Sequence, residues 1–288
     1  MWVIYALASA FFAGSMSFLA KIGIKNTDSN LATALRTIVV VIFAWLMVFV
    51  VGSQNTITQI SAKSLIFLVL SGLATGGSWL CYFRALQIGN VNKVVPVDKS
   101  STILTMLLSF ILLNEGVTWL KAAAVILIGV GTYLMIDRKE NSPDHEQGYK
   151  WLIYAILSAV FASLTAILGK IGIADVESNL GTAIRTVVVL VMAWMIVFMQ
   201  GKQHEIKTID KRSRVFIVLS GLATGLSWVC FYRALQDGPA GVVVPIDKLS
   251  ILVTVLFSGL FLHERLSKKS ATGLVLFVAG TLSLLIKT

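Results

Sequence analysis

The sequence has few charged residues, and this shortage excludes a soluble globular fold. Only 13% of its 288 residues are charged, about half the usual share of about 25% in soluble domains. Hydrophobic residues make up 57% of the chain, and the mean hydropathy is +0.85. We therefore predict an all-α integral membrane protein, since helices satisfy their backbone polar groups within lipid.

Cysteines and motifs for catalysis are equally scarce. The two cysteines, Cys81 and Cys230, stand within apolar segments, which favours small packed residues over a disulfide or a metal site. No nucleotide-binding loop of the form GxxxxGK[ST] occurs. We find no catalytic motif and no metal-ligand spacing. The sequence therefore predicts neither an enzyme nor a protein that needs a cofactor or a metal.

Acidic residues are outnumbered by basic ones, with 14 Asp and Glu against 24 Lys and Arg. In a soluble protein this net charge of +10 would indicate nucleic acid as a partner. In a membrane chain it indicates basic loops that face the cytoplasm, so the expected partners are the lipid bilayer and a small-molecule substrate. Met1–Ile4 has no basic residue, which predicts a retained first span rather than a signal peptide. The bilayer we expect is the cytoplasmic membrane of a bacterium or archaeon.

The chain repeats itself without a gap at an offset of 149 residues, as from Ser71 to Ser220, and nearly half of the aligned positions are identical. The segments Ser71–Gly76, Tyr82–Gln87 and Val94–Lys99 recur as Ser220–Gly225, Phe231–Gln236 and Val243–Lys248. Self-similarity on this scale indicates a duplicated structural unit. Two related units around a site at mid-membrane are typical of secondary transporters.

Each copy contains five apolar stretches long enough to cross about 30 Å of hydrocarbon. In the first copy they lie near 2–24, 31–51, 64–88, 93–113 and 119–136. In the second copy they lie near 151–173, 180–200, 213–237, 242–262 and 268–286. The predicted organisation is a first repeat at 1–136, a polar linker at 137–150 and a second repeat at 151–288.

Because five spans are an odd number, two such repeats in tandem must have opposite orientations. The loop charges agree, since the loop at 52–63 has one basic residue whereas the equivalent loop at 201–214 has five. The positive-inside tendency places the second loop in the cytoplasm and both termini outside. One chain then supplies both orientations, so neither an oligomer nor an obligate protein partner is required.

Ionisable residues recur inside these apolar segments. The first copy has Arg36, Arg84, Asp98 and Lys99, and the second has Arg185, Arg233, Asp247 and Lys248. A charge deep in a membrane helix costs about 2.5–3.5 kcal/mol on insertion scales, so it should face a partner or water. We expect a substrate site that includes these residues, with the two aspartates as candidates for proton coupling. A structural ion pair between Arg36 or Arg84 and Asp98 is the rival interpretation, since Asp98 and Lys99 diverge by about 100° on a helix.

Other membrane-embedded residues carry weaker signals. Lys21 and Lys170 lie near helix ends and can extend to the interface. Glu115 and Glu264 also lie at helix ends, which favours a solvated or loop-anchoring role over coupling. Hydroxyl residues follow each aspartate at helical spacing, beginning with Ser101 and Ser250, and line either a cavity or a helix contact. Trp79 and Trp228 either flank the pathway or pack. The GxxxG pairs Gly72/Gly76 and Gly221/Gly225 favour close helix packing.

Several of these features resemble the EamA family of the drug/metabolite transporter superfamily. They are Ala85-Leu86 and Ala234-Leu235 in the third span, Pro96 and Pro245 in the fourth, Glu115 and Glu264 at its end, and Gly129, Gly131, Gly273 and Gly280 in the fifth. The resemblance covers nearly the whole chain, and each half resembles the short, single-repeat members. It implies a ten-helix transporter fold with cytoplasmic termini, opposite to the direction that the loop charges give.

The function that these features favour is secondary transport by alternating access. The excess of basic residues favours a small polar, anionic metabolite with a carboxylate or phosphate group. Two alternatives remain: proton-coupled export of cationic or amphipathic compounds, and flipping of a lipid-linked phosphate. The sequence does not decide the substrate, the direction of transport or the coupling ion.

Overall fold

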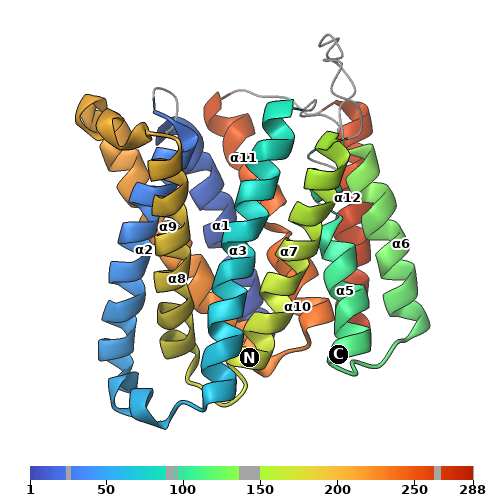
Figure 1. The fold of residues 1–288 in the computed structure, drawn as a ribbon. Coiled ribbons are helices and arrows are strands. Elements are labelled where there is room, and N and C mark those ends of the chain that lie inside the picture. The colour runs from blue at the N-terminus through green and yellow to red at the C-terminus, as the bar shows by residue number, and fades with distance from the viewer. Residues whose placement is uncertain are drawn as a thin grey trace.

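The protein is a bundle of helices whose long axes run between the two ends of the molecule (Figure 1). The computed structural model describes residues 1–23, 27–88, 94, 97–98, 100–135, 150–262 and 267–287. Within these ranges every regular element is a helix. The all-α prediction is therefore confirmed for the described chain.

The helices of the first repeat are α1 (Trp2–Gly23), α2 (Ser29–Val51), η1 (Ser53–Gln59), α3 (Ala62–Ile88), α5 (Ser101–Leu112) and α6 (Trp119–Leu134). Those of the second are α7 (Lys150–Gly172), α8 (Ser178–Met199), η2 (Lys202–Thr208), α9 (Lys211–Asp237), α10 (Ala240–Asp247), α11 (Ser250–Leu262), α12 (Lys268–Ser283) and η3 (Leu284–Lys287). The predicted linker at 137–150 lies outside the described residues except for Lys150, which begins α7.

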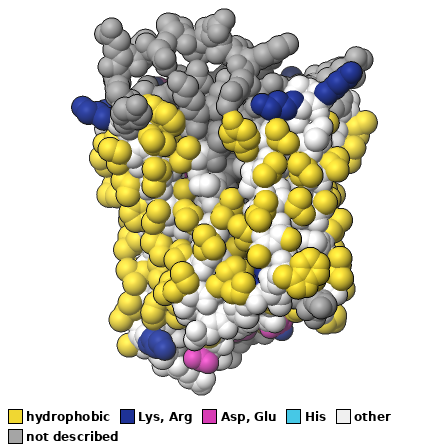
Figure 2. Space-filling view, turned by 90° about the vertical axis from the view of Figure 1, so that its right-hand side faces the viewer, with side chains coloured by type: hydrophobic (Ala, Val, Ile, Leu, Met, Phe, Trp, Pro, Cys, Tyr) yellow, Lys and Arg dark blue, Asp and Glu magenta, His cyan; other side chains and the backbone are white. Residues whose placement is uncertain are grey.

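Eight candidate membrane spans occur in the described residues, with α10 and α11 counted together as Ala240–Phe257. The shorter apolar helices α5 and α6 add two more. Figure 2 shows apolar side chains over the side of the bundle, with charged side chains towards the two ends. Large side chains such as Ile42, Ile111 and Trp119 are more than 60% exposed. Such a surface suits lipid, and the protein is an integral membrane protein.

Equivalent positions in the two repeats begin and end helices in the same way. The Asp28 carboxylate accepts hydrogen bonds from backbone N–H groups at the start of α2, and Glu177 does so for α8. Such caps satisfy donors that a helix leaves free at its N-terminus. Gly52 and Gly201 then adopt left-handed conformations, with φ of 79° and 67°, and each leads into a short 3₁₀ helix. The sequence did not predict η1 or η2.

The most extensive packing joins the two repeats. Helix α3 lies along α7, α1 along α9, α6 along α12 and α2 along α8. Glycines also permit close approach of α3 to α8 and of α9 to α2, because a Cβ at Gly72 would lie 2.7 Å from Val188 and one at Gly221 would lie 2.7 Å from Val39. The packing role predicted for the GxxxG pairs is therefore confirmed.

The span predicted at 242–262 is divided in the structure. Helix α10 ends at Asp247 and α11 begins at Ser250. Pro245 has no N–H to donate to the carbonyl of Gly241, which weakens the helix there. Across the break, Leu249 N–H donates to Ile246 C=O at 2.9 Å and Leu252 N–H donates to Leu249 C=O at 2.8 Å. These tighter i→i−3 bonds redirect the chain at Asp247 and Lys248.

Candidate functional site

A cavity of about 380 Å³ lies midway along the helices and takes its lining from both repeats. Its walls come from the middle of the long helices, around Ala13 of α1, Thr75 of α3, Ala162 of α7 and Thr224 of α9. The remaining wall comes from α5, α8, and the break between α10 and α11. The cavity therefore lies near the centre of the bundle.

The charged residues in the described lining are Arg185, Asp247 and Lys248. The lining also contains Trp79, Trp228, Phe231 and Tyr232, together with several serine and threonine hydroxyls. With two cations and one anion, it carries one net positive charge when all three side chains are ionised. Aromatic faces and a few polar groups are typical of small-molecule sites.

Arg185 of α8 is the most deeply buried of these charges, at 1% exposure. Its Nη2 donates to Thr75 Oγ1 at 2.7 Å, and its Nε donates to Ser71 Oγ at 3.3 Å. Its guanidinium carbon lies 5.1 Å from the Trp228 ring centre and 4.5 Å from that of Tyr232. These aromatic faces attract the cation. Among the described carboxylates, none is within 4 Å of this guanidinium.

Arg36, the equivalent residue of the first repeat, has different surroundings. Its Nη1 lies 3.1 Å from the Met16 sulfur, where the second repeat has Thr165. Thr165 accepts a hydrogen bond from Ser71 through its backbone and lies 3.3 Å from Thr75 through its hydroxyl. It therefore supports the hydroxyl groups that hold Arg185. The two arginines are equivalent in sequence, but only Arg185 is part of the described cavity lining.

The two aspartates have matching hydrogen bonds that cross between the repeats. Ser158 of α7 donates to Asp98 Oδ1 at 2.8 Å, and Ser9 of α1 donates to Asp247 Oδ1 at 2.6 Å. Each serine also lies 3.2 Å from a second hydroxyl, Ser78 beside Ser158 and Ser227 beside Ser9. Hydrogen bonds to an ionised group are stronger than those between neutral groups. Each carboxylate is thus held by the first helix of the other repeat.

Lys248 lies beside Asp247 at the break in the fourth span. Its Nζ is 3.9 Å from Asp247 Oδ2. The two residues lie where α10 ends at Asp247, just before α11 begins at Ser250. Both line the cavity.

The sequence of each half matches the model of the EamA-like transporter family, over residues 1–137 and 149–286. The chain belongs to this family. It is therefore a membrane transporter, which implies a lipid bilayer around it and a small-molecule substrate. The family resemblance inferred from its glycines, prolines and glutamates is confirmed.

The relatives of this EamA chain include one of about half its length. An uncharacterized transporter in the cobO 3' region of Sinorhizobium sp is 44% identical over 134 residues, which are 46% of this chain and 95% of that protein. The uncharacterized transporter YxxF of Bacillus subtilis is 20% identical over 240 residues, 83% of this chain and 74% of its own length. The names of both relatives describe transporters and give no substrate.

A solved crystal structure, titled only as that of a protein, shares the fold of this EamA chain. The two agree with a TM-score of 0.78 over 98% of this chain and 96% of that one, at 15% identity. At so low an identity the likeness shows the fold alone.

The structure brings together seven of the twelve residues that the sequence singled out. Ser101, Ser250, Trp79 and Trp228 line the cavity with Arg185, Asp247 and Lys248. Arg36 and Asp98 are placed as described above. Arg84 is exposed, and Arg233 lies 3.2 Å from Asp237 on the same helix, with both side chains partly exposed. Lys99 lies outside the described residues.

The pairing proposed for Asp98 with an arginine differs from the contact observed, which comes from Ser158. Sequence reasoning missed the serines beside both aspartates, although Ser9 recurs as Ser158 and Ser78 as Ser227. Repetition of polar residues in apolar helices was the available signal. Of the described His, Cys, Asp and Glu side chains, no three gather in a group that could hold a metal ion.

Proposed function

We propose that this chain is a secondary transporter for a small anionic metabolite and that the central cavity is its substrate site. The observation that carries the proposal is the Arg185 guanidinium, buried in the cavity wall between two aromatic rings and held by neutral hydroxyls. A planar guanidinium suits a carboxylate or phosphate group. A substrate anion would supply the negative charge opposite Arg185, which the neutral hydroxyls of Thr75 and Ser71 lack.

The transport mechanism we propose is alternating access by two inverted repeats, at 1–136 and 151–288, joined by the linker at 137–150. In Figure 1, α1 and α7 run in opposite directions, as do the equivalent helices α2 and α8. The matching serine–aspartate contacts support the same relation. An inverted pair can exchange its two conformations and so expose a central site to either side of the membrane in turn.

The test of the anion proposal compares two equivalent substitutions. Counterflow in proteoliposomes, with panels of anionic and cationic metabolites, identifies the transported class. We expect Arg185→Gln to reduce anion exchange by at least tenfold, since a charged hydrogen bond is worth about 1.5–3 kcal/mol. Arg36→Gln, the matched variant, should cause a smaller loss. Equal losses would contradict the assignment of Arg185, and exchange of cations alone would contradict the anionic substrate.

Proton-coupled export of a cationic compound is a second candidate, favoured by the Asp247 carboxylate in the cavity wall. A carboxylate that alternates between proton and substrate is the minimum for such exchange. An imposed pH gradient distinguishes the two. If it drives uptake of a cation, and Asp247→Asn abolishes that uptake, the second candidate replaces the first.

A further inference from the structure

The end of the molecule at which α7 finishes contains a second hollow, which the proposed substrate site does not use. In Figure 1 the corner between α9 and α10 lies at the lower end, near both termini. A hollow of about 490 Å³ opens there, with Glu115, Lys170 and Gln236 in its lining. None of these three residues lines the central cavity, yet each makes hydrogen bonds between different helices or loops.

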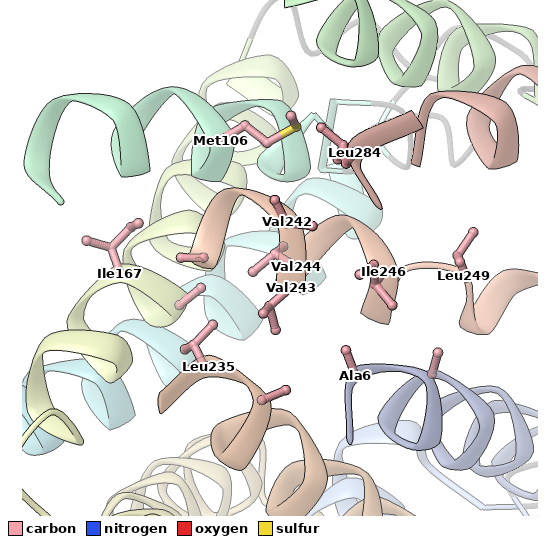
Figure 3. Close-up of a cluster of buried hydrophobic side chains, with 14 of the residues drawn as sticks. Ala6, Met106, Ile167, Leu235, Val242, Val243, Val244, Ile246, Leu249 and Leu284 are labelled. Carbon is pink, nitrogen blue, oxygen red and sulfur yellow. The ribbon is translucent and has the colours of Figure 1, made fainter. Parts of the chain in front are cut away.

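The short helix α10 separates this hollow from the central cavity. Its residues Val242, Val243 and Ile246 are fully buried, and Figure 3 shows them among Met106 of α5, Ile167 of α7 and Leu235 of α9. Eight helical residues span roughly 12 Å at 1.5 Å each. Helix α10 thus forms an apolar layer, with Asp247 at the central cavity and its N-terminus at the lower hollow.

Glu115 holds the N-terminus of α10. Its carboxylate accepts a hydrogen bond from the backbone N–H of Ala240, and another from that of Gly241 at 3.0 Å. The first N–H groups of a helix have no partner within it, and a negative charge is favourable there. Glu115 follows α5 in the chain, so these bonds tie the loop at 113–118 to α10.

Lys170 and Gln236 hold the neighbouring corner. Lys170 of α7 donates to the carbonyl of Leu235 at 2.7 Å and to that of Gly238, where the positive charge suits the C-terminal end of α9. Gln236 of α9 donates to the carbonyls of Ile173 and Val176, each at 2.7 Å. All these partners are backbone groups at the ends of helices or in the loops between helices.

We infer that Glu115, Lys170 and Gln236 form a polar latch, which holds α10 across the lower end of the transport pathway. The inference rests on the proposed function, because a latch has a role only if the central cavity opens to the two sides in turn. Helix α10 couples the latch to the substrate site, since its last residue, Asp247, lines the cavity. These three residues are thus positioning residues for transport, although they do not touch the cavity.

The experiment measures how fast a thiol reagent reaches the buried face of α10, and it requires no substrate. Both native cysteines are replaced by alanine, and Val243→Cys provides a reporter that is 0% exposed in the latched structure. A membrane-impermeant methanethiosulfonate is added to each side of proteoliposomes. We expect Glu115→Ala and Lys170→Met to raise the labelling rate roughly tenfold from the side that bears residues 113–118, as loss of one charged hydrogen bond allows.

The controls remove charges of the same sign from the same hollow. Asp175 and Lys63 line the hollow but are exposed, so Asp175→Ala and Lys63→Met should leave the rate unchanged. A second reporter, Ile217→Cys, lies 4% exposed near the start of α9 and detects general loosening. Should a latch variant fail to fold, Glu115→Gln and Gln236→Leu supply milder changes.

Equal labelling in latch and control variants would overturn the inference, as would an equal rise from both sides or at both reporters. Because the assay requires no substrate, faster labelling from one side supports the latch even if anion counterflow fails. Unchanged labelling together with successful counterflow would reject the latch alone.

Discussion

Two membrane-embedded aspartates are held by the same arrangement of hydroxyls, yet only Asp247 belongs to the described cavity lining. Their serine partners both come from the opposite repeat, so each carboxylate joins the two halves. The arginines diverge in a similar way, because Arg185 has Thr75 and Tyr232 as neighbours whereas Arg36 contacts Met16. The equivalent charges of the two repeats therefore have different neighbours.

This difference predicts unequal effects of two equivalent serine substitutions. Ser9→Ala removes the 2.6 Å hydrogen bond to Asp247, and we expect transport to fall by roughly tenfold or more, from the loss of about 1.5–3 kcal/mol. Ser158→Ala removes the corresponding bond to Asp98 and should affect transport less. Initial uptake rates in proteoliposomes, normalised to the amount of folded protein, make the comparison. Equal rates for the two variants would contradict a special role for Asp247.

At the scale of helices, glycines of α3 determine how closely its backbone approaches the neighbouring helices. Helix α3 meets α8 through Gly72 and Gly76, where a Cβ would lie 2.7 Å from Val188 and Met192 respectively. The neighbouring Gly77 faces α7, where a Cβ would meet the Phe161 ring at an ordinary 3.5 Å. The same helix thus contains a crowded glycine position and a tolerant one.

We expect Gly72→Ala to destabilise the protein and Gly77→Ala to leave it near the native stability. A methyl group at Gly72 requires the backbones of α3 and α8 to separate, and overpacking of this kind costs about 1–3 kcal/mol. The midpoint of thermal unfolding in detergent is the measurement. A Gly77→Ala variant with the lower midpoint would contradict the packing described for these helices.

The fourth span of the second repeat is divided into two helices. Pro245 removes one backbone donor, and the chain then turns between α10 and α11 through i→i−3 hydrogen bonds. Asp247 and Lys248 lie at this junction and line the cavity, with Lys248 Nζ 3.9 Å from Asp247 Oδ2.

On the scale of the whole molecule, the two repeats pack on each other more than on themselves. Helices α1 and α9, α3 and α7, and α6 and α12 form pairs that cross the repeat boundary. Several charged contacts also cross the boundary, namely the serine–aspartate bonds and the bonds of Arg185 to α3. One relative has about half the length of this chain, which is the length of a single repeat.

Inversion of the repeats predicts that equivalent loops face opposite sides of the membrane. Asn55 of η1 and His204 of η2 occupy equivalent positions and are both exposed. In cysteine-free protein, Asn55→Cys and His204→Cys should react with an impermeant thiol reagent from opposite sides of intact cells. If the basic loop at 201–214 is cytoplasmic, only Asn55→Cys reacts from outside. Labelling of both residues from one side would refute the inversion.

The sequence by itself determined the membrane class, the duplication and the family. Apolar composition and length define a membrane helix, because lipid imposes the same requirement on every span. The helix starts at Ser29 and Ser178 fall within two residues of the predicted ones, since their capping acids stand next to them in the chain. The sequence also contained the GxxxG pairs whose packing role is confirmed.

Only the tertiary structure decided which of the charged side chains line the same cavity. Which side chains face one another depends on contacts between residues more than 100 positions apart, such as Arg185 with Thr75 and Asp247 with Ser9. The capping of α10 by Glu115 likewise depends on a residue more than 100 positions away in the chain. The sequence places the same charged residues at equivalent positions of the two repeats. Packing gives these residues different surroundings, because each hydrogen bond depends on a neighbour from a distant part of the chain.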